Sequence, residues 1–254
     1  GSHKLSGSTI EEYRNAGVRI EAFRSYKFLI NPMQVNFRNH RKILVVDGHF
    51  GFIGGLNLGD EYLGKSARFG AWRDTHAGVE GPAADALQLI FAEDWHWATN
   101  EMPELSWELQ KAGDGREEIL MIASGPADNL ETCALMFVQA INDARQRIWI
   151  ASPYFVPDLQ ILSALKLAAL RGVDVRVMLP EKADHRTVYL ASFTYYQNTL
   201  PLGSNLYRYT AGFMHQKVFL VDSSCAAVGT ATILPLNLRS IAAAGTSRRR
   251  TSGR

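Results

Sequence analysis

Two segments of the sequence carry the same spacing of histidine, lysine and aspartate. The first, residues 40–57, reads HRKILVVDGHFGFIGGLN, and the second, residues 215–232, reads HQKVFLVDSSCAAVGTAT. Both contain His-x-Lys-x4-Asp, and both reach a small-residue pair (GG or GT) shortly after the aspartate. In each copy an apolar run passes through a short turn into a second apolar run, which predicts a β-hairpin. The sequence therefore contains an internal repeat that places the same three chemical groups on two hairpins.

Residues two apart in a β-strand project to the same face, so each histidine projects beside its lysine. The pairs are His40 with Lys42 and His215 with Lys217. Two such pairs, brought face to face, suit a phosphodiester, because the lysines stabilise the charge on a five-coordinate phosphorus. One neutral imidazole would attack phosphorus and form a phosphohistidine, and the other, protonated, would release the leaving alcohol. This chemistry needs no cofactor or metal, and the sequence shows no residue spacing typical of a metal site.

Polar residues near the repeats have both a structural and a chemical interpretation. Asp47 and Asp222 close the motifs where a strand turns, so we expect them to anchor turns as structural carboxylates. Asn57 follows two glycines and is either a turn residue or a phosphate ligand. Asp74 lies in WRDTH and, from the residues alone, is either a surface ion-pair partner or part of the site.

The elements that must position these residues follow from apolar periodicity. Alternation and β-branched content predict strands over 42–47, 50–55, 117–124, 146–152, 173–180, 205–209 and 217–222. Helical periodicity predicts helices over 82–98, 129–146, 158–172 and 185–200. Gly172 is the expected stop of the third helix.

The order strand–helix–strand–helix–strand between residues 117 and 180 is typical of right-handed crossovers in a parallel sheet. We therefore expect an α/β fold with two pseudo-repeated halves, each with a mixed, largely parallel sheet flanked by helices. Residues 1–112 form the first half and residues 113–234 the second, and each carries one motif. Only 39 residues precede His40, so the first half is expected to be incomplete. The small, polar and basic residues 235–254 are expected to form a disordered tail.

Composition sets wider bounds. The 254 residues are 46% hydrophobic and 20% charged, which is typical of a soluble globular protein. A formal charge of +2 is too small to indicate nucleic acid, which we do not expect as a partner. No apolar run reaches the roughly 18 to 20 residues of a membrane-spanning helix. Cys133 and Cys225 lie in apolar runs and are expected to be buried free thiols.

Several segments, taken together, resemble one known family. They are FRNHRKILVVDGHFGFIGGLNLGDEYLG, FGAWRDTHAGVEGPA, LIFAEDWHWAT, IASPYFVPD, AALRGVDVRVMLPEKADHR and GFMHQKVFLVD. The paired motif resembles the phospholipase D superfamily, in which two halves build one active site. WRDTH and SPYFVPD make the chain similar to the bacterial cardiolipin synthases within that superfamily.

The resemblance implies a role for each candidate residue. His40 would be the nucleophile and His215 the general acid, a division that the residues themselves leave open. Asp74 would accept a hydrogen bond from His40 and fix its tautomer. Three residues would contact the phosphate: Lys42, Lys217 and Asn57.

The resemblance also implies an activity and a location. The reaction would move a phosphatidyl group from one phosphatidylglycerol to another, giving cardiolipin and releasing glycerol. Partners would be phosphatidylglycerol, other anionic phospholipids and the membrane surface. The chain would act at the cytoplasmic side of the bacterial cell membrane, as a peripheral protein.

Two features depart from the family pattern. Transmembrane segments and a complete first half usually come first, whereas this chain starts with GSHKLSGS, which resembles either a cloning scar or a native linker. After Asp222 the chain has no acidic residue, and Thr232 stands where the family has asparagine. We therefore expect His215 to lack a carboxylate partner, and the chain to be a fragment with reduced or no activity. A phospholipase D that uses water, a phosphodiesterase or nuclease, and a non-catalytic phospholipid-binding remnant remain as alternatives.

Overall fold

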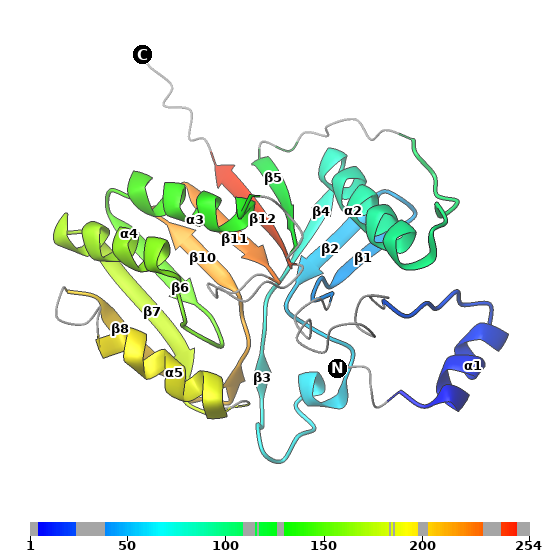
Figure 1. The fold of residues 1–254 in the computed structure, drawn as a ribbon, viewed down its shortest axis with the longest axis horizontal. Helices are drawn as coiled ribbons and strands as arrows, with labels where there is room; N and C mark the ends of the chain where they lie inside the picture. Colours follow the sequence, from blue (N-terminus) through cyan, green and yellow to red (C-terminus); the bar gives the residue numbers. More distant parts are fainter. Residues whose placement is uncertain are drawn as a thin grey trace.

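The computed structural model describes residues 5–23, 39–108, 115, 117–125, 130–182, 184, 186–197, 203–230 and 240–247. These residues form a three-stranded sheet, a seven-stranded sheet and a two-stranded sheet that joins them (Figure 1). Helices pack against the two larger sheets. None of the helices in these ranges is long and apolar enough to cross a bilayer.

The three-stranded sheet carries the first motif. Its strands, in the order β1-β2-β4, are β1 (Ile43–Val46), β2 (Phe50–Gly54) and β4 (His76–Glu80), and helix α2 (Pro82–Thr99) packs on it. Apolar residues that alternate along the strands meet the apolar face of α2 in a small core. That core consists of Ile53, Val79, Leu87 and Ile90. The predicted strands 42–47 and 50–55 and the predicted helix 82–98 are confirmed.

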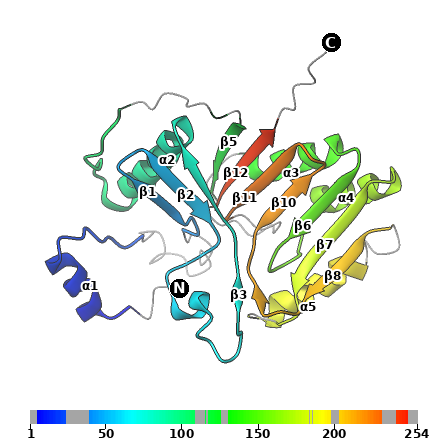
Figure 2. The ribbon, with the colours of Figure 1, turned by 180° about the vertical axis from the view of Figure 1, so that it is seen from behind.

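The seven-stranded sheet carries the second motif and has the order β5-β12-β11-β10-β6-β7-β8. Its strands are β5 (Glu117–Ser124), β6 (Arg147–Ala151), β7 (Asp174–Pro180), β8 (Asn205–Tyr209), β10 (Val218–Val221), β11 (Cys225–Gly229) and β12 (Ser240–Ser247). The helices between them are α3 (Thr132–Asp143), α4 (Leu159–Leu170) and α5 (Arg186–Gln197). Figures 1 and 2 show α3 and α4 together on one face of this sheet, where the main core lies.

Sequence periodicity located most of these elements within a few residues. Helix α4 begins after Asp158, whose side chain accepts a hydrogen bond from the Ile161 N–H, and it ends before Gly172, which adopts a φ of +85°. The main core that α3 and α4 help to form includes the ring pair Phe137 and Phe219. Of the two free cysteines, Cys133 is buried and Cys225 is partly buried.

The mixed α/β class is confirmed, but the strand directions differ from the expectation of largely parallel sheets. Parallel pairing in the large sheet is limited to β6-β7-β8, which are linked through α4 and α5. Strands β5, β12, β11, β10 and β6 pair antiparallel, as do all strands of the three-stranded sheet. Short turns join the motif strands, and a chain that reverses through a short turn can pair only antiparallel.

The expectation of a disordered tail over 235–254 is wrong for part of that segment. Ser240–Ser247 form strand β12, which pairs along its whole length with β5 and also with β11. The segment SIAAAGTS has low intrinsic β propensity, so its backbone pairing between two strands decides its conformation. The remaining residues of the expected tail lie outside the described residues.

The chain also has a helix that periodicity did not indicate. Helix α1 (Gly7–Asn15) begins within the opening GSHKLSGS stretch, and the Ser6 hydroxyl caps it by accepting a hydrogen bond from the Thr9 N–H at 3.1 Å. A serine directly before the first helical residue is a common start signal. Part of the opening stretch is therefore structured.

Two short strands join the halves in the middle of the molecule. Strands β3 (Trp72–Arg73) and β9 (Phe213–Met214) pair parallel, with Arg73 beside Met214. Figures 1 and 2 both show β3 running between the two larger sheets. The pairing needs Gly212, whose φ is +146° and where a Cβ would lie 2.1 Å from the Ala71 carbonyl oxygen. This junction positions the residues that follow each strand.

Candidate active site

The two motif hairpins have the same local geometry. Val46 pairs with Phe50 in the first, and Val221 pairs with Cys225 in the second, so the turns start at Asp47 and Asp222. Both aspartates adopt left-handed backbone angles, with φ of 53° and 52°. The repeat in sequence is thus a repeat in structure.

Asp222 also holds the neighbouring chain. Its carboxylate accepts hydrogen bonds from the backbone N–H groups of Arg145, Gln146 and Arg147 at 3.1, 2.8 and 2.9 Å. Burial alone would raise the pKa of Asp222, but these donors hold that pKa below its usual value. Asp222 therefore acts as a turn anchor that fixes the start of β6 against β10.

Asp74 pairs with the second histidine, not with the first as expected. Its Oδ2 accepts a hydrogen bond from Nδ1 of His215 at 3.0 Å, and its Oδ1 accepts one from the Thr75 N–H at 2.8 Å. The Asp74 side chain has no solvent exposure. The expectation that His215 lacks a carboxylate partner is therefore wrong: the partner comes from the first half of the chain.

The β3–β9 register causes this pairing. Arg73 lies beside Met214, and the His215 N–H donates to the Arg73 carbonyl at 2.8 Å, so the next residue of β3 falls beside His215. Gly55 makes room for the carboxylate, because a Cβ there would lie 2.3 Å from Asp74 Oδ1. The small pair of the first motif thus has a steric role in the site.

Lys217 lies directly against His215. Its Nζ is 3.0 Å from Nδ1 and 3.2 Å from Nε2 of the ring, and it donates to the His215 carbonyl oxygen at 2.8 Å. Only 9% of Lys217 is exposed, and burial lowers its pKa to about 7, while the nearby Asp74 charge opposes that change. The ammonium is therefore held close to the ring and poorly solvated.

Lys42, from the first motif, is also subject to the charge of Asp74. Its Nζ donates to the carbonyl oxygen of His40 at 2.7 Å. Burial lowers the pKa of Lys42 to about 8, and the charge of Asp74 raises it in part. The positive charge of Lys42 also lowers the pKa of Lys217, and the charge of Asp74 raises the pKa of both lysines. His40 is thus tied to the cluster through its backbone.

A buried ion pair fixes the segment that carries His40. The Arg41 guanidinium donates to Asp94 on α2 at 2.6 Å and to the Ser124 carbonyl on β5 at 3.2 Å. Asn39 donates to the same Asp94 carboxylate at 2.8 Å. Because β5 belongs to the large sheet, this contact connects the first motif to both sheets.

The environment of His215 sets its protonation. Burial lowers the pKa of the imidazole, the bond to Asp74 raises it in part, and the Lys217 charge lowers it further. The rings of Trp72, Tyr62 and Phe213 lie 5.6, 6.2 and 6.2 Å from the imidazole, centre to centre. With a carboxylate at Nδ1, the neutral ring carries its proton there and has its lone pair on Nε2.

Asn57 lies at the edge of this cluster. Its amide donates to the hydroxyl of Tyr62, and Tyr62 packs against Trp72 with ring centres 4.5 Å apart. Burial raises the pKa of Tyr62, and the charges of Asp74 and Asp184 add to that effect. Asn57 therefore contacts the site indirectly, through its hydrogen bond to Tyr62.

Sequence reasoning missed other polar residues of the site. Gln216 donates to the Thr75 hydroxyl, beside the Asp74–His215 bond. Tyr154 donates its hydroxyl to Asp184, and the charge of Asp184 acts on both Lys217 and His215. Tyr154 lies in SPYFVPD and Asp184 in EKADHR, segments whose sequence did not indicate a role for either residue.

The arrangement combines two ammonium groups with an imidazole that a buried carboxylate orients. Such a set can hold a phosphate oxygen and transfer a proton at Nε2 of His215. Lys42 and Lys217, each from a different motif, approach the same carboxylate. The two halves of the chain thus contribute to one candidate site.

Comparisons with known proteins agree on the family that this chain resembles. A family model described as "Cardiolipin synthase, PLD-like domain" matches residues 137–240. Cardiolipin synthase A of Pseudomonas fluorescens (strain SBW25) is 52% identical over 235 residues, covering 92% of this chain and 48% of that protein. Cardiolipin synthase A of Pseudomonas aeruginosa (strain LESB58) is 51% identical over 233 residues, covering 92% and 47%.

The chain spans about half the length of the curated relatives that it matches. Among solved structures, phosphatidylserine synthase of Haemophilus influenzae Rd KW20 shares the fold with a TM-score of 0.63. That match has 14% identity and covers 87% of this chain and 61% of the other. Over most of its length the chain is therefore similar to the cardiolipin synthases of the phospholipase D superfamily.

Proposed function

We propose that this chain is the phosphatidyl-transferring region of a cardiolipin synthase. It would transfer a phosphatidyl group from one phosphatidylglycerol to a second, with release of glycerol. The observation that carries the proposal is the contact of His215 and Lys217, from the second motif, with Asp74, which comes from the half that carries the first motif. The high identity to proteins named cardiolipin synthase A supports the choice of reaction.

In the first step a ring nitrogen of His40 attacks phosphorus, and the bond from phosphorus to the glycerol oxygen breaks. Nε2 of His215 gives its proton to that oxygen. A bound phosphate raises the low pKa of His215 through its negative charge, so the ring is protonated when it must act as an acid. The lysines stabilise the charge that builds on the non-bridging oxygens.

In the second step a hydroxyl of another phosphatidylglycerol attacks the phosphohistidine. The hydroxyl gives its proton to Nε2 of His215, and the bond between phosphorus and His40 breaks. Cardiolipin leaves, and both rings return to their starting states. Water in place of the second lipid would give phosphatidic acid.

A membrane surface is the natural place for this reaction. The loop after β2, residues 56–63, ends in a short 3-10 helix, η3 (Asp60–Leu63). It exposes Leu56, Leu58 and Leu63, and Leu58 is fully exposed. The same loop carries Asn57 and Tyr62, which border the site. Exposed leucines beside a headgroup site support contact with the acyl region of a bilayer.

Product analysis with labelled phosphatidylglycerol vesicles tests the proposal. We expect cardiolipin and glycerol in equal amounts, and neither product from His40→Ala or His215→Ala. Acid-free trapping followed by mass spectrometry should place the phosphate on His40. Phosphatidic acid as the main product would indicate a hydrolase, metal-independent DNA cleavage a nuclease, and lipid binding without turnover a non-catalytic remnant.

A further inference from the structure

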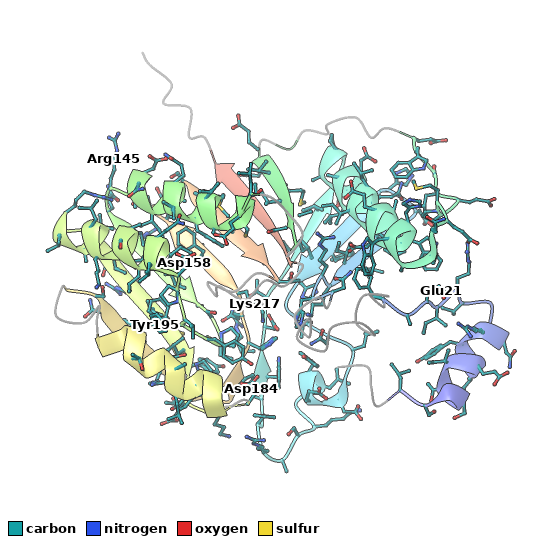
Figure 3. The ribbon with its side chains drawn as sticks, viewed as in Figure 1. Glu21, Arg145, Asp158, Asp184, Tyr195 and Lys217 are labelled. Atoms are coloured by element: carbon teal, nitrogen blue, oxygen red, sulfur yellow. The ribbon has the colours of Figure 1, made fainter. Side chains whose placement is uncertain are left out.

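Asp184 and Tyr154 form a polar pair beside the candidate site but outside both motifs. Tyr154 lies between β6 and α4, and its hydroxyl donates to Oδ2 of Asp184, which lies between β7 and α5. Val218 pairs with Ala151 of β6, so Lys217 lies beside Ser152, two residues before Tyr154, and Figure 3 labels Asp184 below Lys217 near the lower end of the large sheet. The pair therefore comes from the loops at one edge of the second half.

The segment around Tyr154 is firmly held. The Phe155 N–H donates to the hydroxyl of Ser192 on α5 at 3.2 Å, and Phe155 is among the most completely buried side chains. Tyr154 itself also bonds through its N–H to Ser152 at 3.4 Å. The phenol thus approaches Asp184 from a fixed backbone.

The charge of Asp184 acts on the pKa of several other groups at the site. It raises the pKa of Lys217 and of His215, each against a larger effect of burial, and it adds to the raised pKa of Tyr62 in the first half. Burial and the same carboxylate raise the pKa of Tyr154, so the phenol stays protonated and acts as a donor. Asp184 is only partly buried, which leaves it accessible to a bound headgroup.

We propose that Asp184, held by Tyr154, is a hydroxyl-binding subsite for the polyol headgroup of the lipid. The inference rests on the proposed function and adds its substrate selectivity. An ionised carboxylate can accept about four hydrogen bonds, so Asp184 can accept one from a hydroxyl while Tyr154 donates to it. A polyol attached to a phosphate near Lys217 carries two hydroxyls within a few bonds of that phosphate, whereas water has no such tether. Asp184 is thus a specificity residue that favours a polyol as the group that enters or leaves.

Binding of two small phosphates tests this subsite directly. Glycerol 1-phosphate and propyl phosphate differ only in the two hydroxyls, and calorimetry gives the affinity of each. We expect wild type to prefer glycerol 1-phosphate about tenfold, as two added hydrogen bonds to a charged group allow. Asp184→Asn should lose the preference and still bind propyl phosphate, and Tyr154→Phe should weaken the preference.

Asp174→Asn is the matched control. Asp174 also pairs with an aromatic donor, Trp149, and with Arg176, but it takes no part in the charge cluster of the site. The control should keep the tenfold preference. Equal affinity of wild type for the two phosphates would overturn the subsite. So would an equal loss of both affinities in Asp184→Asn, because Asp184 would then act only through the charge of Lys217.

The vesicle assay separates this inference from the proposed function. If no lipid product forms but the preference for glycerol 1-phosphate depends on Asp184, the subsite stands and the synthase proposal fails. If cardiolipin forms and wild type shows no preference, the synthase proposal stands and the subsite fails. In an active chain, Asp184→Asn should shift the products from cardiolipin toward phosphatidic acid, and an unchanged product ratio would also overturn the subsite.

Discussion

Asp74 and His215 lie 141 residues apart in the sequence, yet Oδ2 of Asp74 accepts a hydrogen bond from Nδ1 of His215 at 3.0 Å. The carboxylate comes from the first half of the chain and the imidazole from the second. The bond therefore makes the orientation of His215 depend on the docking of the segment that carries Asp74. It also supplies the carboxylate partner that the residues after Asp222 do not contain.

Removing the charge of Asp74 should damage catalysis more than folding. Asp74→Asn leaves the shape of the side chain but no longer holds the His215 proton on Nδ1, so we expect kcat for cardiolipin formation to fall about 10³–10⁴-fold. Steady-state kinetics on phosphatidylglycerol vesicles measure this. Glu101→Gln, which removes a carboxylate from a surface ion pair with Arg19, is the control and should keep wild-type kcat. An active Asp74→Asn would contradict the role assigned to the bond.

A single added methyl group at Gly55 should have a similar effect. Its Cβ would lie 2.3 Å from Asp74 Oδ1, so the carboxylate must move away from His215. We expect Gly55→Ala to lower kcat about 10²-fold, the usual cost of misplacing a reacting group by an ångström. Gly7→Ala, where a Cβ meets nothing within 4 Å, is the control for a glycine replacement. Retained activity with a displaced carboxylate would argue against Asp74 as an orienting group.

The buried lysines should make stability depend on pH. The pKa of Lys217 is about 7 in the folded chain and 10.5 ordinarily, so the unfolded chain binds more protons between these values. The free energy of unfolding should therefore rise with pH from 7 to about 9, before tyrosines titrate. Lys217→Met removes the buried charge, and we expect it to stabilise the fold by a few kcal/mol at pH 7 while activity is lost.

Urea denaturation at several pH values measures both effects. The difference in unfolding free energy between Lys217→Met and wild type should shrink as pH rises. Lys166→Met, on helix α4, is the control, because it replaces a lysine outside the buried cluster and should not change the slope. A difference that is constant with pH would show that Lys217 is fully charged in the folded chain.

Asp222 should matter for folding more than its counterpart in the first hairpin. Asp222→Ala leaves three backbone N–H groups without their acceptor, and we expect a loss of about 1–3 kcal/mol in the free energy of unfolding. Asp47 has the same left-handed backbone, and within the described residues its side chain makes no hydrogen bond. Asp47→Ala therefore measures only the free-energy cost of placing alanine in a left-handed backbone conformation.

The acid side of the stability curve gives a second measure of Asp222. Its folded pKa is lowered, so its contribution is complete above about pH 4 and is lost as pH falls through the folded pKa. Asp222→Ala should flatten this acid loss, and Asp47→Ala should not. Equal destabilisation by the two variants at neutral pH would show that the three hydrogen bonds add nothing.

The exposed leucines of residues 56–63 should determine how strongly the chain binds to vesicles. We expect Leu58→Ser/Leu63→Ser to lower the partition of the chain onto phosphatidylglycerol vesicles at least about tenfold, because two leucines no longer enter the bilayer. Leu159→Ser/Leu170→Ser on α4 is the matched control, with 78% and 68% exposure at the replaced residues. Co-sedimentation measures the partition. An equal loss in both double variants would show general hydrophobic adsorption instead of binding through residues 56–63.

The local parts of this structure could be predicted from the sequence. Residue periodicity and local backbone preferences predict the hairpins of both motifs and the helices α2 and α4. They also predict that α4 ends at Gly172. The same reasoning identified the paired lysines, because a two-residue spacing on a strand puts His and Lys on one face. The order of elements also indicated the parallel pairing of β6 and β7.

Pairing between distant segments could not be predicted in this way. The choice of His215 as the partner of Asp74 depends on the register of β3 with β9, two strands of two residues each. Strand β12 is a run of small residues whose conformation is decided by the strands on both sides. The Tyr154–Asp184 pair joins two loops whose sequences show no spacing signal.

The sequence by itself determined the repeated motif, the faces on which its histidines and lysines lie, and the chemistry that such groups can perform. Only the tertiary structure decided which carboxylate orients which histidine, and that Asp184 joins the site. The reason is the range of the interactions involved. Periodicity and turn preference act between neighbours in the chain, whereas the Asp74–His215 bond exists only once two separately formed sheets have packed together.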